Sequence, residues 1–141
     1  MPPHGLVGAK DYLAGGPNGT LPELCVAGDF EGLIYDYDAV IAASLSRRFE
    51  RGLEGRVIAG VMPSWDNSAR RRRAAHIAHG ANPLRFEKWL RGLAARRLAG
   101  SYRQELMVNA WNEWAEKAVL EPSVQYGRAA LDALAAARAG A

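Results

Sequence analysis

Three short apolar stretches, each followed by a segment with helical periodicity, limit the fold of this chain more than any other feature. They lie at residues 32–37, 57–62 and 106–111, and the first, which is also aromatic, reads as a strand or turn. An apolar run that does not alternate with polar residues is typical of a parallel strand buried on both faces. Because strands that alternate with helices form right-handed crossover units, the sequence predicts an α/β fold with a parallel sheet.

The helices expected after these strands have apolar residues on one face. Asp38 is the expected N-cap of the first helix, and Asn82 with Pro83 supplies the cap and the first-turn proline of the second. Residues 1–31 contain most of the turn-forming residues, so we expect a largely irregular loop there. The three apolar faces consist of Ile41, Leu45 and Phe49; of Phe86, Trp89, Leu90 and Leu93; and of Ala130, Leu131, Leu134 and Ala137.

The composition excludes several classes of protein. With 141 residues, of which 49% are hydrophobic and 23% charged, the chain can bury one ordinary core. No uncharged apolar run reaches the roughly 20 residues that a membrane-spanning helix needs. The single cysteine, Cys25, cannot form an internal disulfide, and no charged-then-apolar leader follows Met1, so a reducing cytoplasm is the expected location. The net charge of +3 comes largely from arginines that do not interleave with aromatic residues, which disfavours a nucleic-acid partner.

Polar and aromatic residues gather in three clusters at expected strand ends. They are PPH at residues 2–4, PSWDN at 63–67 and NEWAE at 112–116. In parallel α/β folds, ligands bind beyond the carboxyl ends of the strands. We therefore expect the three clusters to face one cleft.

The third cluster contains two carboxylates, Glu113 and Glu116, that are three residues apart. Such a pair can point into one pocket, or it can be exposed at a helix start, where carboxylates complement the dipole. Two carboxylates are the minimum set for glycosidic chemistry, and aromatic rings and amides suit the faces and hydroxyls of a sugar. The amides can equally satisfy backbone groups of the loop. The neighbouring rings and amides are Trp111, Trp114, Asn109 and Asn112.

Two basic features support weaker hypotheses. The arginine run at residues 70–73 can bind the phosphate of a nucleotide-sugar or lipid-linked donor, but the preferred interpretation is the solvated start of a helix. His76 and His79 can share a helix face, yet no third ligand lies at a suitable spacing, so we expect no metal site. Nothing in the sequence requires a cofactor.

The stretch NAWNEWAE at residues 109–116, followed by LEP at 120–122 and YG at 126–127, resembles the terminal motif of WbsX-type glycosyltransferases, the glycoside hydrolase family 99-like proteins. Residues 2–5, 35–38, 61–71 and 82–90 are similar to further segments of that family, in the same order. The resemblance therefore spans nearly the whole chain. It has two departures, because Lys117 stands where the family usually has glycine and Ser123 where it usually has aspartate.

The resemblance implies the fold of only part of a larger domain. The family is built on a (β/α)8 barrel, and such barrels need about 250 residues. We therefore expect residues 1–141 to form a single partial domain, the C-terminal part of a TIM-type barrel with about three β/α units. Because these units cannot close eight strands, we expect a fragment that is inactive alone, and a start at Met1 that reflects a truncated or miscalled gene product.

The resemblance also implies roles for individual residues. In the hydrolase relatives the two glutamates of the motif are the catalytic pair. By this resemblance Glu113 is the base toward the sugar 2-hydroxyl, and Glu116 is the acid and then the base at the leaving oxygen. The sugar contacts implied by the resemblance are Trp65, Asp66, Asn67 and, at the rim, His4.

The expected function is glycosyl transfer in the biosynthesis of a cell-surface polysaccharide of O-antigen or lipopolysaccharide type, with a carbohydrate substrate. Two alternatives remain open: a non-catalytic or vestigial sugar-binding half-barrel, and an endo-acting glycoside hydrolase. The sugar, the linkage and the oligomeric state do not follow from the sequence.

Overall fold

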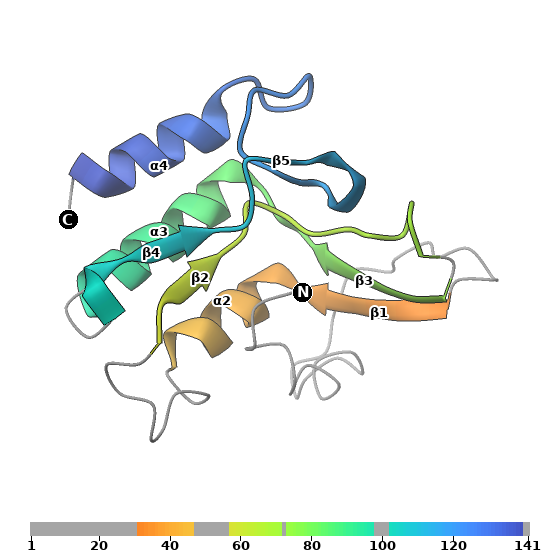
Figure 1. Cartoon of the computed structure of the whole chain (residues 1–141), viewed down its shortest axis with the longest axis horizontal. Helices are drawn as coiled ribbons and strands as arrows, with labels where there is room; N and C mark the ends of the chain where they lie inside the picture. Colours follow the sequence, from red (N-terminus) through yellow and green to blue (C-terminus); the bar gives the residue numbers. More distant parts are fainter. Residues whose placement is uncertain (1–30, 47–56, 72, 98–101, 140–141) are drawn as a thin grey trace.

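The computed structural model describes residues 31–46, 57–71, 73–97 and 102–139, and Figure 1 shows how their helices and strands are arranged. The expected loop at 1–30, with Cys25 and His4, lies outside these ranges, as does Phe49. The elements in chain order are β1 (Glu31–Asp36), α2 (Tyr37–Leu45), β2 (Ala59–Val61), β3 (Arg73–His79), α3 (Pro83–Arg97), η4 (Tyr102–Gln104), β4 (Leu106–Val108), β5 (Asn112–Glu113), η5 (Trp114–Glu116), β6 (Ala118–Val119) and α4 (Ala129–Ala139).

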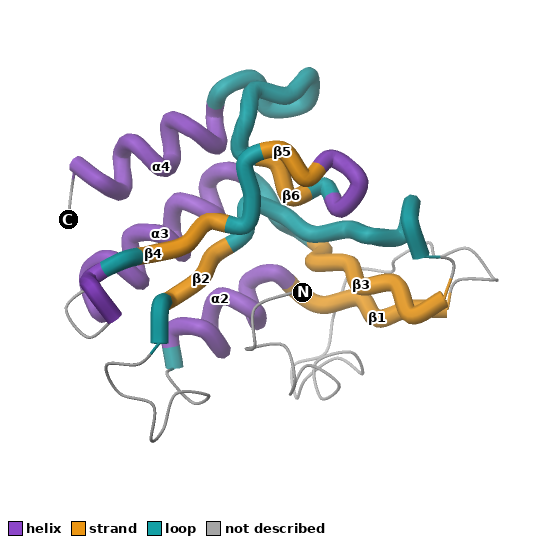
Figure 2. The backbone as a smooth tube through the Cα atoms, in the orientation of Figure 1, coloured by secondary structure: helices purple, strands orange, loops and turns teal. Residues whose placement is uncertain are grey.

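The described strands form three pairs rather than one continuous sheet. β1 runs parallel to β3, and β2 runs parallel to β4. β5 and β6 form a short antiparallel hairpin, which follows β4 in Figure 2. The predicted α/β class is confirmed in this mixed form, and the apolar runs at 57–62 and 106–111 do contain strands that pair in parallel.

β3 corrects the prediction of a helix after the arginine run. Arg73 begins a strand instead, and Ile77 of this strand lies opposite Ile34 of β1. Pairing with β1 outweighs the local preference of an arginine- and alanine-rich segment for helix. Residues three apart on a strand point to opposite faces, so His76 and His79 do not share a face as the helical prediction required.

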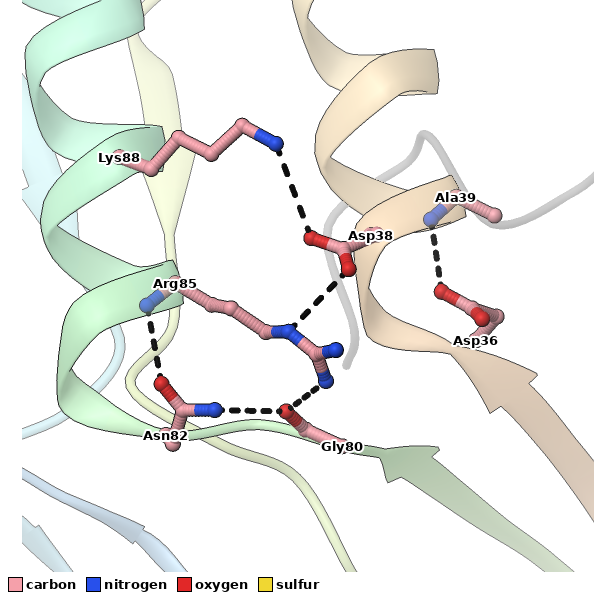
Figure 3. A network of polar contacts seen from close by, with 7 residues as sticks. All are labelled: Asp36, Asp38, Ala39, Gly80, Asn82, Arg85 and Lys88. Carbon is pink, nitrogen blue, oxygen red and sulfur yellow. Dashed lines mark hydrogen bonds and ion pairs between the residues drawn. The ribbon is translucent and has the colours of Figure 1, made fainter. Parts of the chain in front are cut away.

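The cap of α2 is Asp36 and not Asp38, which is a second correction. The Oδ1 atom of Asp36 accepts a hydrogen bond from the Ala39 backbone N at 3.0 Å. Asp38 lies in the first turn of α2, where it forms ion pairs with Arg85 at 3.1 Å and Lys88 at 3.9 Å (Figure 3). Because both partners are on α3, Asp38 joins the two helices.

The start of α3 agrees with the sequence. The Oδ1 atom of Asn82 accepts a hydrogen bond from the Arg85 backbone N at 3.0 Å, as expected of an N-cap before Pro83 (Figure 3). Gly80, with φ of 82°, makes the turn out of β3, and its carbonyl accepts a hydrogen bond from Arg85 Nη1 at 2.6 Å. A side chain at position 80 would contact the Arg85 guanidinium, so both the backbone angle and the close approach favour glycine here.

The core lies between the helices and the parallel strands. Trp89 is fully buried, packs edge-to-face on Tyr37 at 5.7 Å, and donates through Nε1 to Ser44 Oγ at 3.0 Å. The Tyr37 hydroxyl donates to the Met62 carbonyl at 2.6 Å, which joins α2 to the end of β2. The apolar face predicted for α3 is buried as expected, through Phe86, Trp89, Leu90 and Leu93.

α3 is the central helix of the described part of the chain, with contacts to α2, to α4 and to β2 (Figure 1). α4 turns Ala133 and Ala137 into the core and packs Leu131 and Leu134 against it. None of the described helices is long and apolar enough to cross a membrane.

The N-cap of α3 provides a test of the fold. Replacing Asn82 with Ala leaves the Arg85 backbone N without its side-chain acceptor, so we expect the free energy of unfolding to fall by about 1 kcal/mol. Urea unfolding followed by circular dichroism measures the loss. Gln125→Ala is the matched control, since Gln125 is an exposed amide in a loop, and its unfolding free energy should be unchanged. Equal stability of Asn82→Ala and wild type would refute the assigned cap.

Candidate functional site

Two of the three expected clusters follow strands that end side by side. Val61, the last residue of β2, lies opposite Val108, the last residue of β4. The pairing extends one step further, because the Asn109 backbone N donates to the Val61 carbonyl at 2.8 Å. Since the two strands are parallel, the segments that follow them leave the sheet at the same edge. The PSWDN and NEWAE segments are therefore brought together, whereas the PPH segment lies outside the described residues.

Direct contacts join the two segments, although they are about fifty residues apart in the chain. The Asp66 backbone N donates to the Glu116 carbonyl at 2.7 Å, and the Ser64 hydroxyl donates to the Lys117 carbonyl. Two ion pairs cross between the same segments: Lys117 Nζ lies 2.6 Å from Asp66 Oδ2, and Arg70 Nη1 contacts Glu116 Oε1. The loop after β2 and the loop after β4 thus form one unit.

The segment after β2 is held from its other side by β3. The Ala78 backbone N donates to the Trp65 carbonyl at 2.7 Å, and the His76 backbone N donates to Asn67 Oδ1 at 2.7 Å. Trp65 is 7% exposed and Asn67 is 8% exposed. In this structure both side chains are therefore enclosed by protein, and the Asn67 amide oxygen already has a partner.

Asp66 is surrounded by hydrogen-bond donors. Its Oδ1 atom accepts from the backbone N and the hydroxyl of Ser68, at 3.0 and 2.6 Å, while Oδ2 faces Lys117. Burial alone raises the pKa of this carboxyl, but the hydrogen bonds from Lys117 and Ser68 and the charge of Lys117 outweigh it and hold the pKa of Asp66 below its ordinary value. Asp66 is therefore a charged anchor of the loop.

Glu116 is the more enclosed of the two glutamates. Its side chain is 12% exposed, and Oε1 faces the Arg70 guanidinium. The other oxygen, Oε2, is buried without a hydrogen-bond partner among the described residues, and the indole Nε1 of Trp65 is in the same condition. Buried polar atoms of this kind are uncommon and are usually satisfied by water or by a ligand.

The other residues of the cluster face solvent. Glu113 and Asn112 form the exposed strand β5, and no group among the described residues pairs with the Glu113 carboxylate. Trp111 and Trp114 are 55% and 53% exposed as residues, and Trp114 Nε1 donates to Glu121 Oε1. Large exposed aromatic rings beside free carboxylate and amide groups can stack on the apolar face of a sugar and bind its hydroxyls.

The remaining candidates are less informative. Asn109 is half-buried directly after β4, and its backbone N donates the hydrogen bond to the Val61 carbonyl of β2. His76 shares a hydrogen bond of 2.8 Å with the Tyr35 hydroxyl, and burial, followed by the charge of Arg71, lowers the pKa of His76. The described ranges contain no group of three or more side chains suited to a metal ion.

The ion pairs made by Arg70 and Lys117 do not follow from sequence reasoning. Arg70 belongs to a run of arginines interpreted as a solvated helix start, whereas in the structure it lies in the loop after the bridge between Asp66 and Ile77 and contacts Glu116. Lys117 has a left-handed backbone with φ of 52°, a conformation that favours glycine, which the resembling family usually has there. The lysine in place of the family's usual glycine was therefore the one sequence feature that pointed to position 117.

The environment of Asp66 predicts a pH-dependent stability. Because the folded-state pKa is lowered, the stabilisation is complete above the ordinary pKa near 4 and is lost as the pH falls through the folded-state pKa. We expect Asp66→Asn to lower the free energy of unfolding by about 1 kcal/mol at pH 7, and by progressively less below pH 4. Chemical unfolding across this pH range measures the difference. Glu113→Gln is the control, because Glu113 is exposed and no group among the described residues pairs with it. A pH-independent effect of Asp66→Asn would contradict the assignment.

Comparison with known proteins finds a matching family model and two relatives. The family model described as Glycosyltransferase WbsX matches residues 11–134. Two curated relatives, from strain B100 and a second strain of Xanthomonas campestris pv. campestris, are both called Uncharacterized protein WxcX, and each is 38% identical to this chain over 125 residues. The matched region is 83% of this chain but 17% of the relative, so the chain spans under a fifth of the length of these relatives. No solved structure matches the chain.

The family match extends over the parts of the chain that build the site. Residues 11–134 include the parallel strands β2 and β4, the PSWDN loop and the NEWAE loop that the two ion pairs join. With a match over most of its length, the chain belongs to the WbsX glycosyltransferase family.

Proposed function

We propose that this chain carries the carboxylate- and tryptophan-bearing part of a site that forms glycosidic bonds in a cell-surface polysaccharide. The observation that carries the proposal is the joining of the PSWDN and NEWAE loops at the carboxyl ends of β2 and β4. Ligand sites of parallel α/β folds form at this end of the strands. Membership of the WbsX family supports a carbohydrate as the substrate, with a nucleotide-sugar or lipid-linked donor.

The difference between the two glutamates supports distinct roles for them. Glu113 is exposed and unpaired among the described residues, so its carboxylate is open to a substrate hydroxyl. Glu116 is held by Arg70 and keeps one buried, unpartnered oxygen. We assign Glu113 as the base that takes the proton of the sugar 2-hydroxyl, so that the 2-oxygen bonds to the anomeric carbon as the bond to the leaving oxygen breaks, and Glu116 as the acid that protonates the leaving oxygen. Glu116 then acts as the base toward the incoming acceptor hydroxyl, whose oxygen replaces the 2-oxygen on the anomeric carbon, and the 2-oxygen regains its proton from Glu113. Positioned acid–base groups of this kind contribute about a hundredfold or more to a rate.

The other side chains are assigned to two layers. Trp111 and Trp114 supply exposed ring faces for the sugar, with Asn112 beside them. Trp65, Asp66 and Asn67 lie behind them and fix the loop, with Trp65 Nε1 left free for a ligand or water. Asn109 and His4 complete the proposed set of sugar-contacting residues.

The proposed context is the C-terminal part of a (β/α)8 barrel in a longer protein. β2 and β4 lie side by side and parallel, and α3 packs on β2. Neighbouring strands of a barrel require this arrangement. The curated relatives are much longer than the matched region, which leaves room for the other strands. We therefore propose that residues outside this region complete the site, and that this chain alone does not turn over substrate.

Glutamine substitutions test the catalytic assignment. Glu113→Gln and Glu116→Gln keep the size of the side chain but remove its acid–base function, so each should lower the rate of polysaccharide synthesis by about a hundredfold or more. The variants are introduced into the full-length protein and expressed in a strain that lacks the gene. The initial rate of sugar incorporation into polysaccharide in cell extracts measures the effect.

Glu87→Gln is the matched control for these variants. Glu87 forms an ion pair with Arg91 at 2.8 Å on α3, as Glu116 does with Arg70, but it lies outside the joined loops. Its substitution should leave the rate unchanged. Wild-type rates in both Glu113→Gln and Glu116→Gln would exclude the catalytic role. Sugar binding by a wild-type full-length protein that supports no synthesis would favour a non-catalytic sugar-binding module.

The tryptophans are tested separately, by binding. Trp111→Ala and Trp114→Ala each remove an exposed ring, and we expect each to weaken binding of the surface polysaccharide by about tenfold, since a stacked ring contributes about 1 kcal/mol or more. Trp114→Phe keeps a ring but loses the hydrogen bond to Glu121, and should retain most of the affinity. Calorimetry with purified oligosaccharide fragments of the polysaccharide measures the affinities.

Tyr102→Ala is the matched control for the tryptophan variants. Tyr102 is 51% exposed, which is close to the exposure of the two tryptophans, but it precedes β4 and so lies at the opposite end of that strand from the site. Equal losses of affinity in Tyr102→Ala and in the tryptophan variants would show that exposed rings in general, and not this site, bind the sugar.

A further inference from the structure

We propose that Arg70 is a positioning residue that fixes the carboxylate of Glu116 in the site. The proposal rests on the proposed function, because it assigns a partner to the glutamate expected to act at the leaving oxygen. Arg70 Nη1 contacts Glu116 Oε1, and the two residues are 46 positions apart in the chain. A contact over that separation requires both loops to be in place.

The backbone around Arg70 is arranged to present its side chain. The Arg70 backbone N donates to the Asn67 carbonyl at 3.1 Å, which closes a turn after the PSWDN segment. Asp66 holds the start of this turn through two hydrogen bonds from Ser68. Asn67, which is buried, ties the same turn to β3 through the His76 backbone. The backbone position from which the Arg70 side chain starts is therefore held by this turn.

The contact leaves one glutamate oxygen for the reaction. Arg70 occupies Oε1, while Oε2 is buried and has no partner among the described residues. The contact runs from Nη1 to Oε1, and the planar guanidinium that makes it is more rigid than the ammonium of a lysine, so it restrains the place of that oxygen. Removal of such a restraint moves the reacting atom, and a displacement of about 1 Å can lower a rate by about a hundredfold.

Exposure to water distinguishes this ion pair from the one that Arg73 of the same arginine run forms. Arg73 pairs with Glu31 at 3.3 Å, but those side chains are 85% and 60% exposed. In the pair of Arg70 with Glu116 the side chains are 60% and 12% exposed, so only the carboxylate end of this pair is shielded from water. Lys117, another cation of the joined loops, is engaged by Asp66 at 2.6 Å. Among the described residues, Arg70 is therefore the cation that pairs with Glu116.

The test compares Arg70→Gln, Arg70→Lys and Arg73→Gln in the full-length protein. The first readout is the initial rate of polysaccharide synthesis in extracts of the complemented strain. The second is the position of the Glu116 side-chain carboxyl ¹³C resonance, identified by its loss in Glu116→Gln. The third is thermal unfolding, which reports whether each variant is folded.

We expect Arg70→Gln to lower the rate by about tenfold to a hundredfold and to shift the Glu116 resonance. Arg70→Lys keeps the positive charge but replaces the planar guanidinium with a flexible ammonium, so it should recover part of the rate and part of the resonance position. Arg73→Gln should change neither. A merely structural role would lower the unfolding temperature in proportion to the rate and would leave the Glu116 resonance of the folded fraction in place.

Two outcomes overturn the inference, and they are distinguishable. If Glu116→Gln lowers the rate but folded Arg70→Gln does not, the proposed function stands and the role of Arg70 is excluded. If Glu116→Gln keeps the full rate, the catalytic assignment of Glu116 fails and the role of Arg70 fails with it. Should Arg70→Gln not fold, the comparison of Arg70→Lys with Arg73→Gln decides: a wild-type rate and resonance in Arg70→Lys would overturn the assignment of this role to the guanidinium, whereas a lowered rate and a shifted resonance in folded Arg70→Lys would support it.

Discussion

The parallel pairing of β2 with β4 is the constraint on which the rest of the site depends. Because Val61 and Val108 end their strands at one level, the two following loops leave the sheet together and come within hydrogen-bonding distance. An antiparallel pair would have placed the loops at opposite ends. The backbone bond from Asp66 to the Glu116 carbonyl, at 2.7 Å, extends this alignment beyond the sheet. The two ion pairs add side-chain contacts to a geometry that the backbone already determines.

Burial divides the joined loops into a support and an open face. Trp65 and Asn67 are enclosed between the loop after β2 and β3. Both carboxylate oxygens of Asp66 are engaged, by Ser68 and by Lys117. Trp111, Asn112, Glu113 and Trp114 lie on the exposed side. A binding face needs free polar groups, but those groups keep a fixed arrangement only if a packed layer lies beneath them. The same short motifs supply both layers.

The sequence was enough to predict the α/β class and α3 with its cap. It was also enough to predict the apolar faces of α3 and α4 and the joining of two of the three polar clusters. Those predictions depended on local signals, such as the Asn82–Pro83 start and unbroken apolar runs before polar residues. β3 could not be predicted, because its strand conformation comes from pairing with β1 and not from its arginine- and alanine-rich sequence. Asp36 was missed as a cap because two aspartates two positions apart both suit the role. The partners of Arg70 and Lys117 lie in distant segments, so no local pattern contains them.

Lys117 shows how a departure from a family pattern can be compensated within the site. A non-glycine residue with a left-handed backbone costs about 1 kcal/mol, and this explains why glycine is favoured at a position with φ of 52°. The side chain that creates this cost also places Nζ 2.6 Å from Asp66, whose side chain is 17% exposed, and so contributes an ion pair of comparable size. A glycine would relieve the backbone and leave Asp66 without its cation, although its two bonds from Ser68 would remain. The turn that carries Arg70 depends on those bonds, so the lysine strengthens the joining of the loops without being required for it.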